Sequence, residues 1–303
     1  MAIKSKRFGT HFQGPLLGSH RAGGGLLENL PVDVLSNYLS PYQAWYEDFG
    51  DVVQNIAGLE LMGWAETAIN TPTASTIVVN TNTNCLVLNA GTKAGSGTEI
   101  QFISAPSASS IVGPHNIFGP HTLGDTQLDD AELVLASTIG FNYTGAFDGH
   151  WLFGWCVTDT AIVDNTDGTL ALATGGGVGF LCGETGAITG FSQNGTTVTS
   201  TATLASMPAG VTPANGQPGA GFREFGIRMK YRDASAATGH VEFYIDGRLV
   251  GTLVDNLPSP DGILTFGTSY VAHNGPTAAL AFDLVINDIL SAQTKTGTTR
   301  LTE

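Results

Sequence analysis

The sequence has few basic residues and few charges of either sign. Its 303 residues include 12 lysines and arginines against 26 aspartates and glutamates, a net charge of −14, and only 13% of them are charged. Because nucleic-acid binding depends on basic side chains at the phosphates, this balance argues against nucleic acid as a partner. The chain also lacks an apolar run as long as a membrane helix, and no apolar segment of a secretory signal follows its basic N-terminus. We therefore expect no membrane partner and synthesis in a cytoplasm.

Cysteine is scarce as well. Cys85, Cys156 and Cys182 are odd in number, and no Cys-x-x-Cys pair or Cys/His metal spacing accompanies them. Their neighbours are apolar or glycine-rich. The sequence predicts three buried thiols in a reducing compartment, with a disulfide as the alternative.

What the sequence does contain is alternation of apolar and polar residues. Between Val241 and Leu253 apolar residues recur at every second position, and Asp246-Gly247 lies between the two halves. This pattern is typical of a β-hairpin with one dry face. A three-residue loop at 245–247, with Gly247 at positive φ, would place Phe243 opposite Leu249 and keep that face dry.

Similar runs, separated by turn residues, predict about fifteen short strands and two packed antiparallel sheets. The run Trp151–Val157 is apolar throughout, which is typical of a central strand covered on both faces. The expected strands are Gln43–Phe49, Leu59–Thr67, Ser75–Asn80, Cys85–Asn89, Glu99–Ser104, Leu133–Ser137, Trp151–Asp159, Thr169–Thr174, Val178–Cys182, Thr196–Leu204, Phe222–Tyr231, His240–Ile245, Arg248–Val254, Ile263–Phe266 and Ala279–Asn287.

The N-terminal residues differ from the rest. Residues 1–40 mix aromatics with glycine and proline and show neither period, so we expect an extended arm, then a sandwich over 41–290 and a tail over 291–303. Basic and apolar side chains make docking on a partner the preferred role of the arm, with a flexible tail as the alternative. The candidate docking residues are Lys4, Lys6, Arg7, Phe8, Phe12, Leu16 and Leu17.

Four segments resemble a known fold family. VEFYIDGRLVGTLVDNLP (241–258) and ALAFDLVIND (279–288) resemble the C-terminal half of a concanavalin A-like, or laminin G-like, jelly roll. HWLFGWCVTD (150–159) and DGTLALATGGGVGFLCG (167–183) resemble central strands of such domains in tailed-phage structural proteins. The resemblance covers residues 42–290. It implies a jelly-roll sandwich of two antiparallel sheets, with the closing strand beside Ala44–Asp51.

The resemblance also defines which chemistry to look for. Glycanases of this fold place their carboxylates as Glu-x-Asp-x-x-Glu, and no glutamate of this chain begins that spacing. Asp164–Gly168 and the aspartates of 125–130 offer oxygen ligands for Ca²⁺. They lack the regular Asp-x-Asp-x-Asp-Gly spacing of a dedicated calcium-binding loop. His115 and His121, each in Gly-Pro-His, fit a rigid loop better than a metal clip. We predict no catalytic residue, no metal ligand and no cofactor.

The first functional hypothesis is a non-enzymatic virion structural protein of a tailed phage. It would be a capsid decoration, or cement, protein at the capsid surface that docks through its arm. Its partners would be the major capsid protein, other virion proteins and further copies of itself, and its high net charge would keep it soluble before assembly.

Two alternatives remain. A carbohydrate-binding tail-fibre or adhesin module would bind a glycan through exposed aromatics, for which Tyr143, Phe147 and Trp151 are the candidates; the other interpretation places these three in the core. A glycoside hydrolase is the least favoured, because the carboxylate motif is missing.

Overall fold

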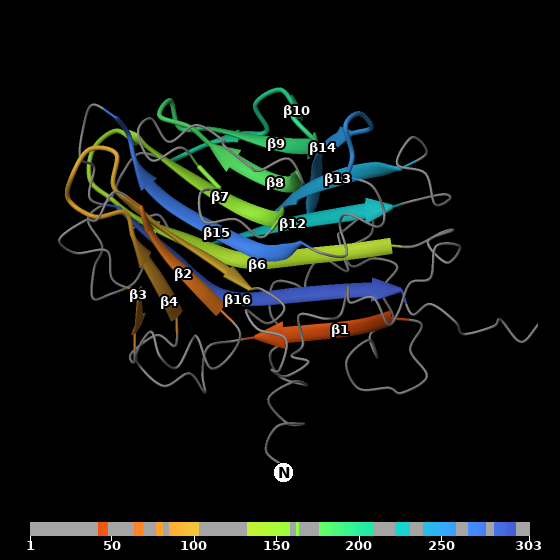
Figure 1. The fold of residues 1–303 in the computed structure, drawn as a ribbon, viewed down its shortest axis with the longest axis horizontal. Helices are drawn as coiled ribbons and strands as arrows, with labels where there is room; N and C mark the ends of the chain where they lie inside the picture. The colour runs from red at the N-terminus through yellow and green to blue at the C-terminus, as the bar shows by residue number, and fades with distance from the viewer. Residues whose placement is uncertain are drawn as a thin grey trace, which may run out of the picture.

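The computed structural model describes residues 42–47, 64–69, 77–80, 85–102, 132–157, 162–163, 176–208, 222–230, 239–258, 266–276 and 282–294. Within these ranges the chain forms sixteen β-strands and no helix (Figure 1). The described residues accordingly contain no helix with the length and hydropathy to cross a membrane. The predicted arm at 1–40 lies outside them.

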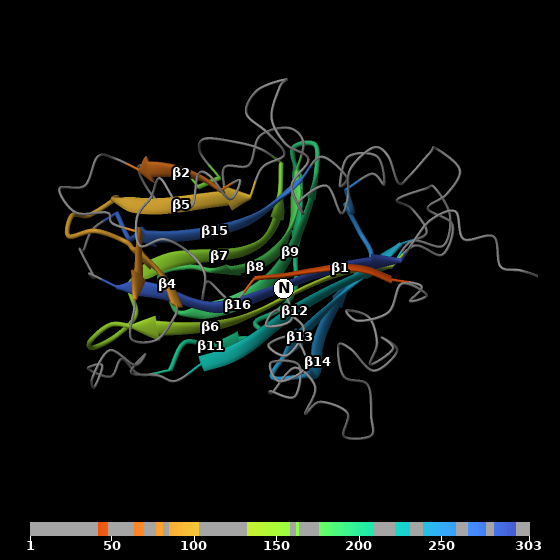
Figure 2. The same ribbon diagram turned by 90° about the horizontal axis from the view of Figure 1, so that it is seen from below.

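The strands form two sheets, which lie one above the other as two curved layers in Figure 2. Sheet A has the order β14 (Arg248–Leu253), β13 (His240–Ile245), β12 (Phe222–Lys230), β6 (Glu132–Asn142), β16 (Asp283–Thr294), β4 (Cys85–Asn89) and β3 (Ile77–Asn80), with β1 (Tyr42–Glu47) also beside β16. Sheet B has the order β10 (Thr197–Ser200), β9 (Ala187–Asn194), β8 (Gly177–Cys182), β7 (Gly149–Cys156), β15 (Gly267–Asn274), β5 (Gly97–Phe102) and β2 (Trp64–Ile69), with β11 (Ala205–Ser206) also beside β9.

The connectivity is that of a jelly roll. All pairs among the described strands are antiparallel. The last two strands, β15 and β16, insert between β5 and β7 in sheet B and between β4 and β6 in sheet A. The predicted all-β sandwich is confirmed, and so is the expected position of β1 beside the closing strand.

The Asp246-Gly247 hairpin differs from its prediction in loop length. Ile245 pairs with Arg248, so the loop has two residues and not three. Asp246 and Gly247 have φ of 51° and 72°, the left-handed conformations of a type I′ turn. Positive φ at Gly247 is therefore confirmed, whereas the three-residue loop is wrong, because an Asp-Gly pair favours the turn whose twist matches that of the strands.

A β-bulge keeps one face of this hairpin dry. The register shifts between Phe243 and Tyr244, so that Phe243 lies opposite Gly251 and not opposite Leu249 as predicted. Val250 packs partly against the core, while Leu249 is 51% exposed. Phe243 itself is fully buried, as expected. The extra residue of the bulge corrects the alternation that a two-residue loop alone would have reversed.

Aromatic side chains fill the space between the sheets. Phe225 of sheet A meets Trp151 and Phe180 of sheet B, each with ring centroids 5.2 Å apart and interplanar angles of 68° and 72°. Phe180 also meets Phe243 at 5.2 Å and 74°. Edge-to-face pairs of this kind contribute about 0.5–1.5 kcal/mol beyond the burial of their area.

A second apolar cluster lies on the opposite face of sheet B. Its members alternate along β7 with the core residues Trp151, Phe153 and Trp155, so they face away from sheet A. Every residue of β7 is buried, which confirms the prediction of a central strand covered on both faces. The second cluster consists of Ile69, Leu152, Cys156, Ile162, Val163, Phe191 and Val271.

The three cysteines are buried and form no disulfide, as predicted. Burial raises the pKa of the Cys182 thiol far above its usual range and outweighs a hydrogen bond with Trp151, which lowers it. A thiol in that environment is inert, because thiolate is the reactive form.

Candidate functional site

The predicted docking residues lie outside the described part of the chain. This holds for Lys4, Lys6, Arg7, Phe8, Phe12, Leu16 and Leu17. The Gly-Pro-His segments around His115 and His121 and the aspartates of 125–130 and 164–167 also lie outside it.

The aromatics considered for glycan binding belong to the core. Tyr143, Phe147 and Trp151 are all buried. The Tyr143 hydroxyl donates to the carbonyl of Pro208, and Trp151 Nε1 lies 3.2 Å from Met207 Sδ. Of the two interpretations of these residues, the core one is confirmed.

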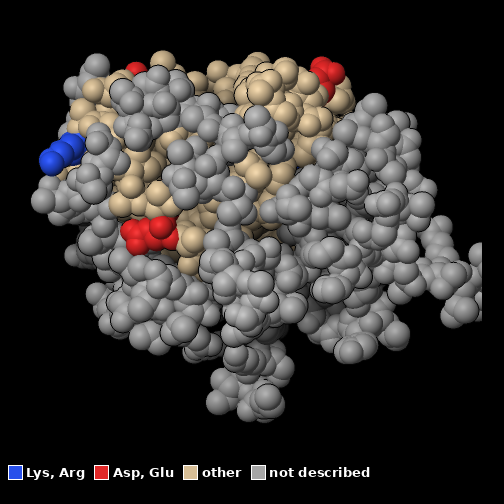
Figure 3. All heavy atoms as spheres, in the orientation of Figure 1, with Lys and Arg blue, Asp and Glu red and all other residues tan. Residues whose placement is uncertain are grey.

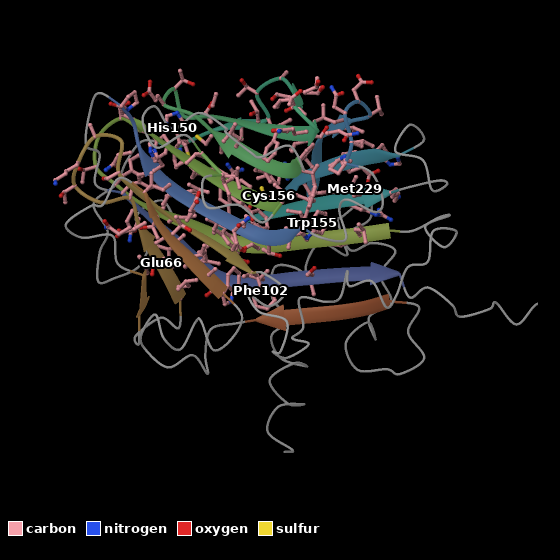
Figure 4. All side chains as sticks on the ribbon, viewed as in Figure 1. Glu66, Phe102, His150, Trp155, Cys156 and Met229 are labelled. Carbon is pink, nitrogen blue, oxygen red and sulfur yellow. The ribbon has the colours of Figure 1, made fainter. Side chains whose placement is uncertain are left out.

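The end of sheet B where β7 begins is polar. His150 and His273 lie opposite each other, with ring centroids 5.9 Å apart, and Figure 4 shows His150 at the far end of β7 from Trp155 and Cys156. Carboxylate oxygens of Asp148 and Glu184 lie 3.1 and 3.0 Å from where a Cβ of Gly275 would stand. Among the described residues, no group of three or more His, Cys, Asp or Glu side chains is arranged to hold a metal ion.

Glu99 is a carboxylate on the outer face of sheet B. It is 1% exposed, and its Oε2 accepts a hydrogen bond of 3.1 Å from the backbone N–H of Ile162. Beside it, Gln101 donates to the carbonyl of Val157 at 3.0 Å and to Ser269 Oγ at 2.9 Å. These hydrogen bonds hold Val157 and Ile162 against the outer face of sheet B. The face around Glu99 and Gln101 is therefore covered by protein and closed to solvent.

Two further carboxylates meet on the outer face of sheet A. Thr138 of β6 lies opposite Glu224 of β12 on one side and opposite Asp288 of β16 on the other. Asp288 Oδ1 accepts a 3.0 Å hydrogen bond from the Thr138 N–H, and both carboxylates are 6% exposed. Burial, then the charges of Asp288 and Asp246, raise the pKa of Glu224 to about 7. Sequence reasoning missed this pair because its members come from different strands.

A carboxyl group that titrates near neutral pH has the property that a general acid needs. A glycosidase, however, needs both carboxyl groups open to the sugar. Glu224 and Asp288 are enclosed, and the Glu224 Oε1 has no hydrogen-bond partner among the residues that the structure describes. The pair is therefore a buried proton-binding pair, with a cost in stability that depends on pH.

The large apolar side chains that are exposed belong to edge strands of the two sheets or directly follow one. Among the described residues they are Val198 of β10 (43%), Leu249 of β14 (51%) and Val254 just after β14 (59%). Asn256 joins the two edges, because its Nδ2 donates to Thr199 Oγ1 at 2.5 Å. We call β10, β14 and residues 254–256 the β10–β14 edge; the strands lie together in Figure 1.

No protein-family model and no curated protein sequence matches this chain. Several solved structures are similar to it. The carbohydrate recognition domain of Emp47p has a TM-score of 0.47 at 15% identity, over 88% of this chain and 96% of that one. A putative β-glucanase from Mycobacterium abscessus has 0.45 at 13%, over 82% and 98%. The alginate lyase Aly36B has 0.45 at 10%, over 82% and 96%.

Proposed function

We propose that the protein is a non-enzymatic structural component of a tailed-phage virion, a capsid decoration protein that docks on the capsid lattice through residues 1–40. The observation that supports this role best is the closure of the sheets. β5, β7 and β15 are buried along their whole length, on both faces. Along these three described strands neither face of sheet B is open to a substrate, as a jelly-roll enzyme would need it to be.

The buried acidic side chains of the described residues support the same role. Glu99, Glu224 and Asp288 are all enclosed by protein. The net charge of −14 keeps such a subunit soluble and separate before assembly.

Deletion of residues 2–30 tests the docking role. The truncated protein is expected to keep its β-sheet circular dichroism and its thermal unfolding but to stop binding undecorated capsids in a sedimentation assay. Phe8→Ala with Phe12→Ala is expected to weaken binding more than Lys4→Ala with Lys6→Ala, because exposed charges are screened by salt whereas buried apolar area is not. Undiminished capsid binding by the truncated protein would exclude the arm as the docking element.

A glycan array gives the competing outcome. Specific glycan binding by the full chain, with no capsid binding, would replace the proposal by a carbohydrate-binding module.

A further inference from the structure

The edge strand β10 carries no charged residue, no proline and no bulge, three of the features that prevent edge-to-edge pairing. It has the sequence Thr-Val-Thr-Ser and pairs with β9 without a bulge. Monomeric sheet proteins protect such edges with charges, proline or bulges. The neighbouring edge strand β14 has two of these features, an exposed Arg248 and the bulge at Val250.

The charge distribution singles out the same strand. From Thr185 to Phe222, a segment that includes β9, β10 and β11, the sequence has no acidic or basic residue, although the chain as a whole carries −14. In Figure 3 the described atoms along the upper rim are mostly neither acidic nor basic. Two copies of an acidic protein repel each other least where each is neutral, so this surface fits a second copy of the same chain.

The backbone of β10 is complementary to itself. The Thr201 N–H donates to the Gly190 carbonyl, and Thr199 lies opposite Ser192 in the same register. In an antiparallel ladder alternate residues bond to the partner strand, so Thr197, Thr199 and Thr201 bond toward β9. Val198 and Ser200 then direct their N–H and C=O groups toward the free edge of sheet B.

We propose that β10 pairs with β10 of a second copy about a two-fold axis through Thr199. Val198 of each copy then lies opposite Ser200 of the other, and their four N–H and four C=O groups that face outward form four hydrogen bonds across the axis. Sheet B continues through the dimer. The contact is short, so the dimer is weak and depends on concentration, and neighbouring contacts in an assembly strengthen it by raising the effective concentration. The pairing does not depend on the virion role, because it concerns the purified chain.

Sedimentation velocity of the full chain over a concentration series tests the dimer. Ser200→Pro removes a donor that faces the free edge and leaves the bonds to β9 in place, as proline at sheet edges does. It is expected to raise the dimer Kd at least tenfold with unchanged thermal unfolding. Val198→Lys is expected to do the same, whereas the matched control Leu249→Lys, on β14, changes the Kd by less than about twofold. A wild-type chain that stays monomeric, or equal effects of Val198→Lys and Leu249→Lys, would overturn the proposal.

Cysteine cross-linking tests the position of the axis. Residues 199 of the two copies form a non-hydrogen-bonded pair with Cα atoms about 4.5 Å apart, within the range of a disulfide. Thr199→Cys is expected to give a covalent dimer on mild oxidation. Val198→Cys is the control and stays monomeric, because the two copies of residue 198 are diagonal to each other. Cross-linking of the control in place of Thr199→Cys would contradict the two-fold axis at Thr199.

Discussion

Phe243 of β13 occupies the space above Gly190 of β9 in the facing sheet. A Cβ on Gly190 would lie 2.6 Å from both Cε2 and Cζ of the Phe243 ring. The bulge in β14 keeps the core-facing side of the hairpin apolar, and the Phe243 ring projects from that side. The glycine in β9 leaves room for this ring, so the bulge and the glycine belong to one packing arrangement.

This contact predicts a coupled pair of substitutions. Phe243→Ala is expected to cost about 3–5 kcal/mol in the free energy of unfolding, and Gly190→Ala about 1–3 kcal/mol from overpacking. Because the alanine methyl group would occupy space that the ring vacates, the double variant should be more stable than the sum of the two losses predicts. Urea unfolding of all four proteins measures the coupling. Additive losses would contradict the contact.

The hairpin turn gives a second prediction. Asp246 Oδ1 accepts a 3.1 Å hydrogen bond from the Glu224 N–H, and its backbone is in the left-handed region. Asp246→Ala loses the acceptor and meets strain, so it is expected to cost about 1–2 kcal/mol. Asp246→Asn keeps the oxygen and tolerates the conformation, and should cost less than half as much in the same urea titration. Equal losses would show that neither feature contributes.

A third prediction concerns the anchor of residues 90–96. Asn274 is fully buried, and its Nδ2 lies 3.1, 3.0 and 2.9 Å from the carbonyl oxygens of Ala90, Gly91 and Lys93. Asn274→Ala removes the donor to Gly91, whereas Ser96 still donates to the Ala90 and Lys93 carbonyls, and the loss is expected to cost about 1–3 kcal/mol. Asn274→Asp should cost more, since it turns a carboxylate toward carbonyl oxygens. Thermal unfolding at neutral pH separates the two, and a milder effect of the aspartate would contradict the assigned bonds.

The Glu224 and Asp288 pair predicts how stability changes with pH. The pKa of Glu224 is raised from its usual 4.5 to about 7, so the folded protein binds this proton more tightly than the unfolded chain does. Its contribution to stability therefore falls as the pH rises from about 4.5 to about 7, by on the order of 3 kcal/mol, and stays low above that. Glu224→Gln removes this loss. It should be more stable than wild type at pH 8 and about equal to it at pH 4.5, measured by urea unfolding.

Glu242 provides the control of opposite sign. Burial raises its pKa, but the hydrogen bond from Tyr244 and the charges of Lys230, Arg228 and His240 outweigh this, and the net pKa is lowered. Its stabilisation is present above the usual carboxyl pKa and is lost as the pH falls through the lowered value. Glu242→Gln should therefore be destabilised at pH 7 and approach wild type in acid. If both glutamine variants shifted stability in the same direction at neutral pH, the two environments would be wrongly assigned.

The sequence predicted the strands with a clear pattern, either alternation or an unbroken apolar run as in β7, and it missed strands in which polar residues or glycine interrupt the pattern. β13 and β14 alternate clearly, whereas β15 was missed because it is buried on both faces and carries Ser269, His273 and Asn274 inside the protein. β9 was missed as well; Gly190 interrupts its pattern, and the reason for that glycine is a ring from the other sheet.

The enclosed carboxylates were beyond the reach of sequence patterns. Glu224 and Asp288 meet only because β12, β6 and β16 are neighbours, and the register of β16 shifts between Ile286 and Asp288. A motif search along one strand, such as the one for Glu-x-Asp-x-x-Glu, does not detect a pair built across three strands. The arm at residues 1–40 was expected from composition alone and lies outside the described residues, so both the arm and its docking role stay predictions.

The most direct test of the proposed role is the composition and image of the particle itself. Under the proposal the chain is encoded by a tailed phage, and virions of that phage would be purified, quantified by mass spectrometry and imaged by electron cryo-microscopy. The proposal predicts many copies per particle, with β-sandwich density on the outer capsid surface at repeated lattice positions. Absence of the protein from purified virions, or density confined to the tail fibres, would contradict it.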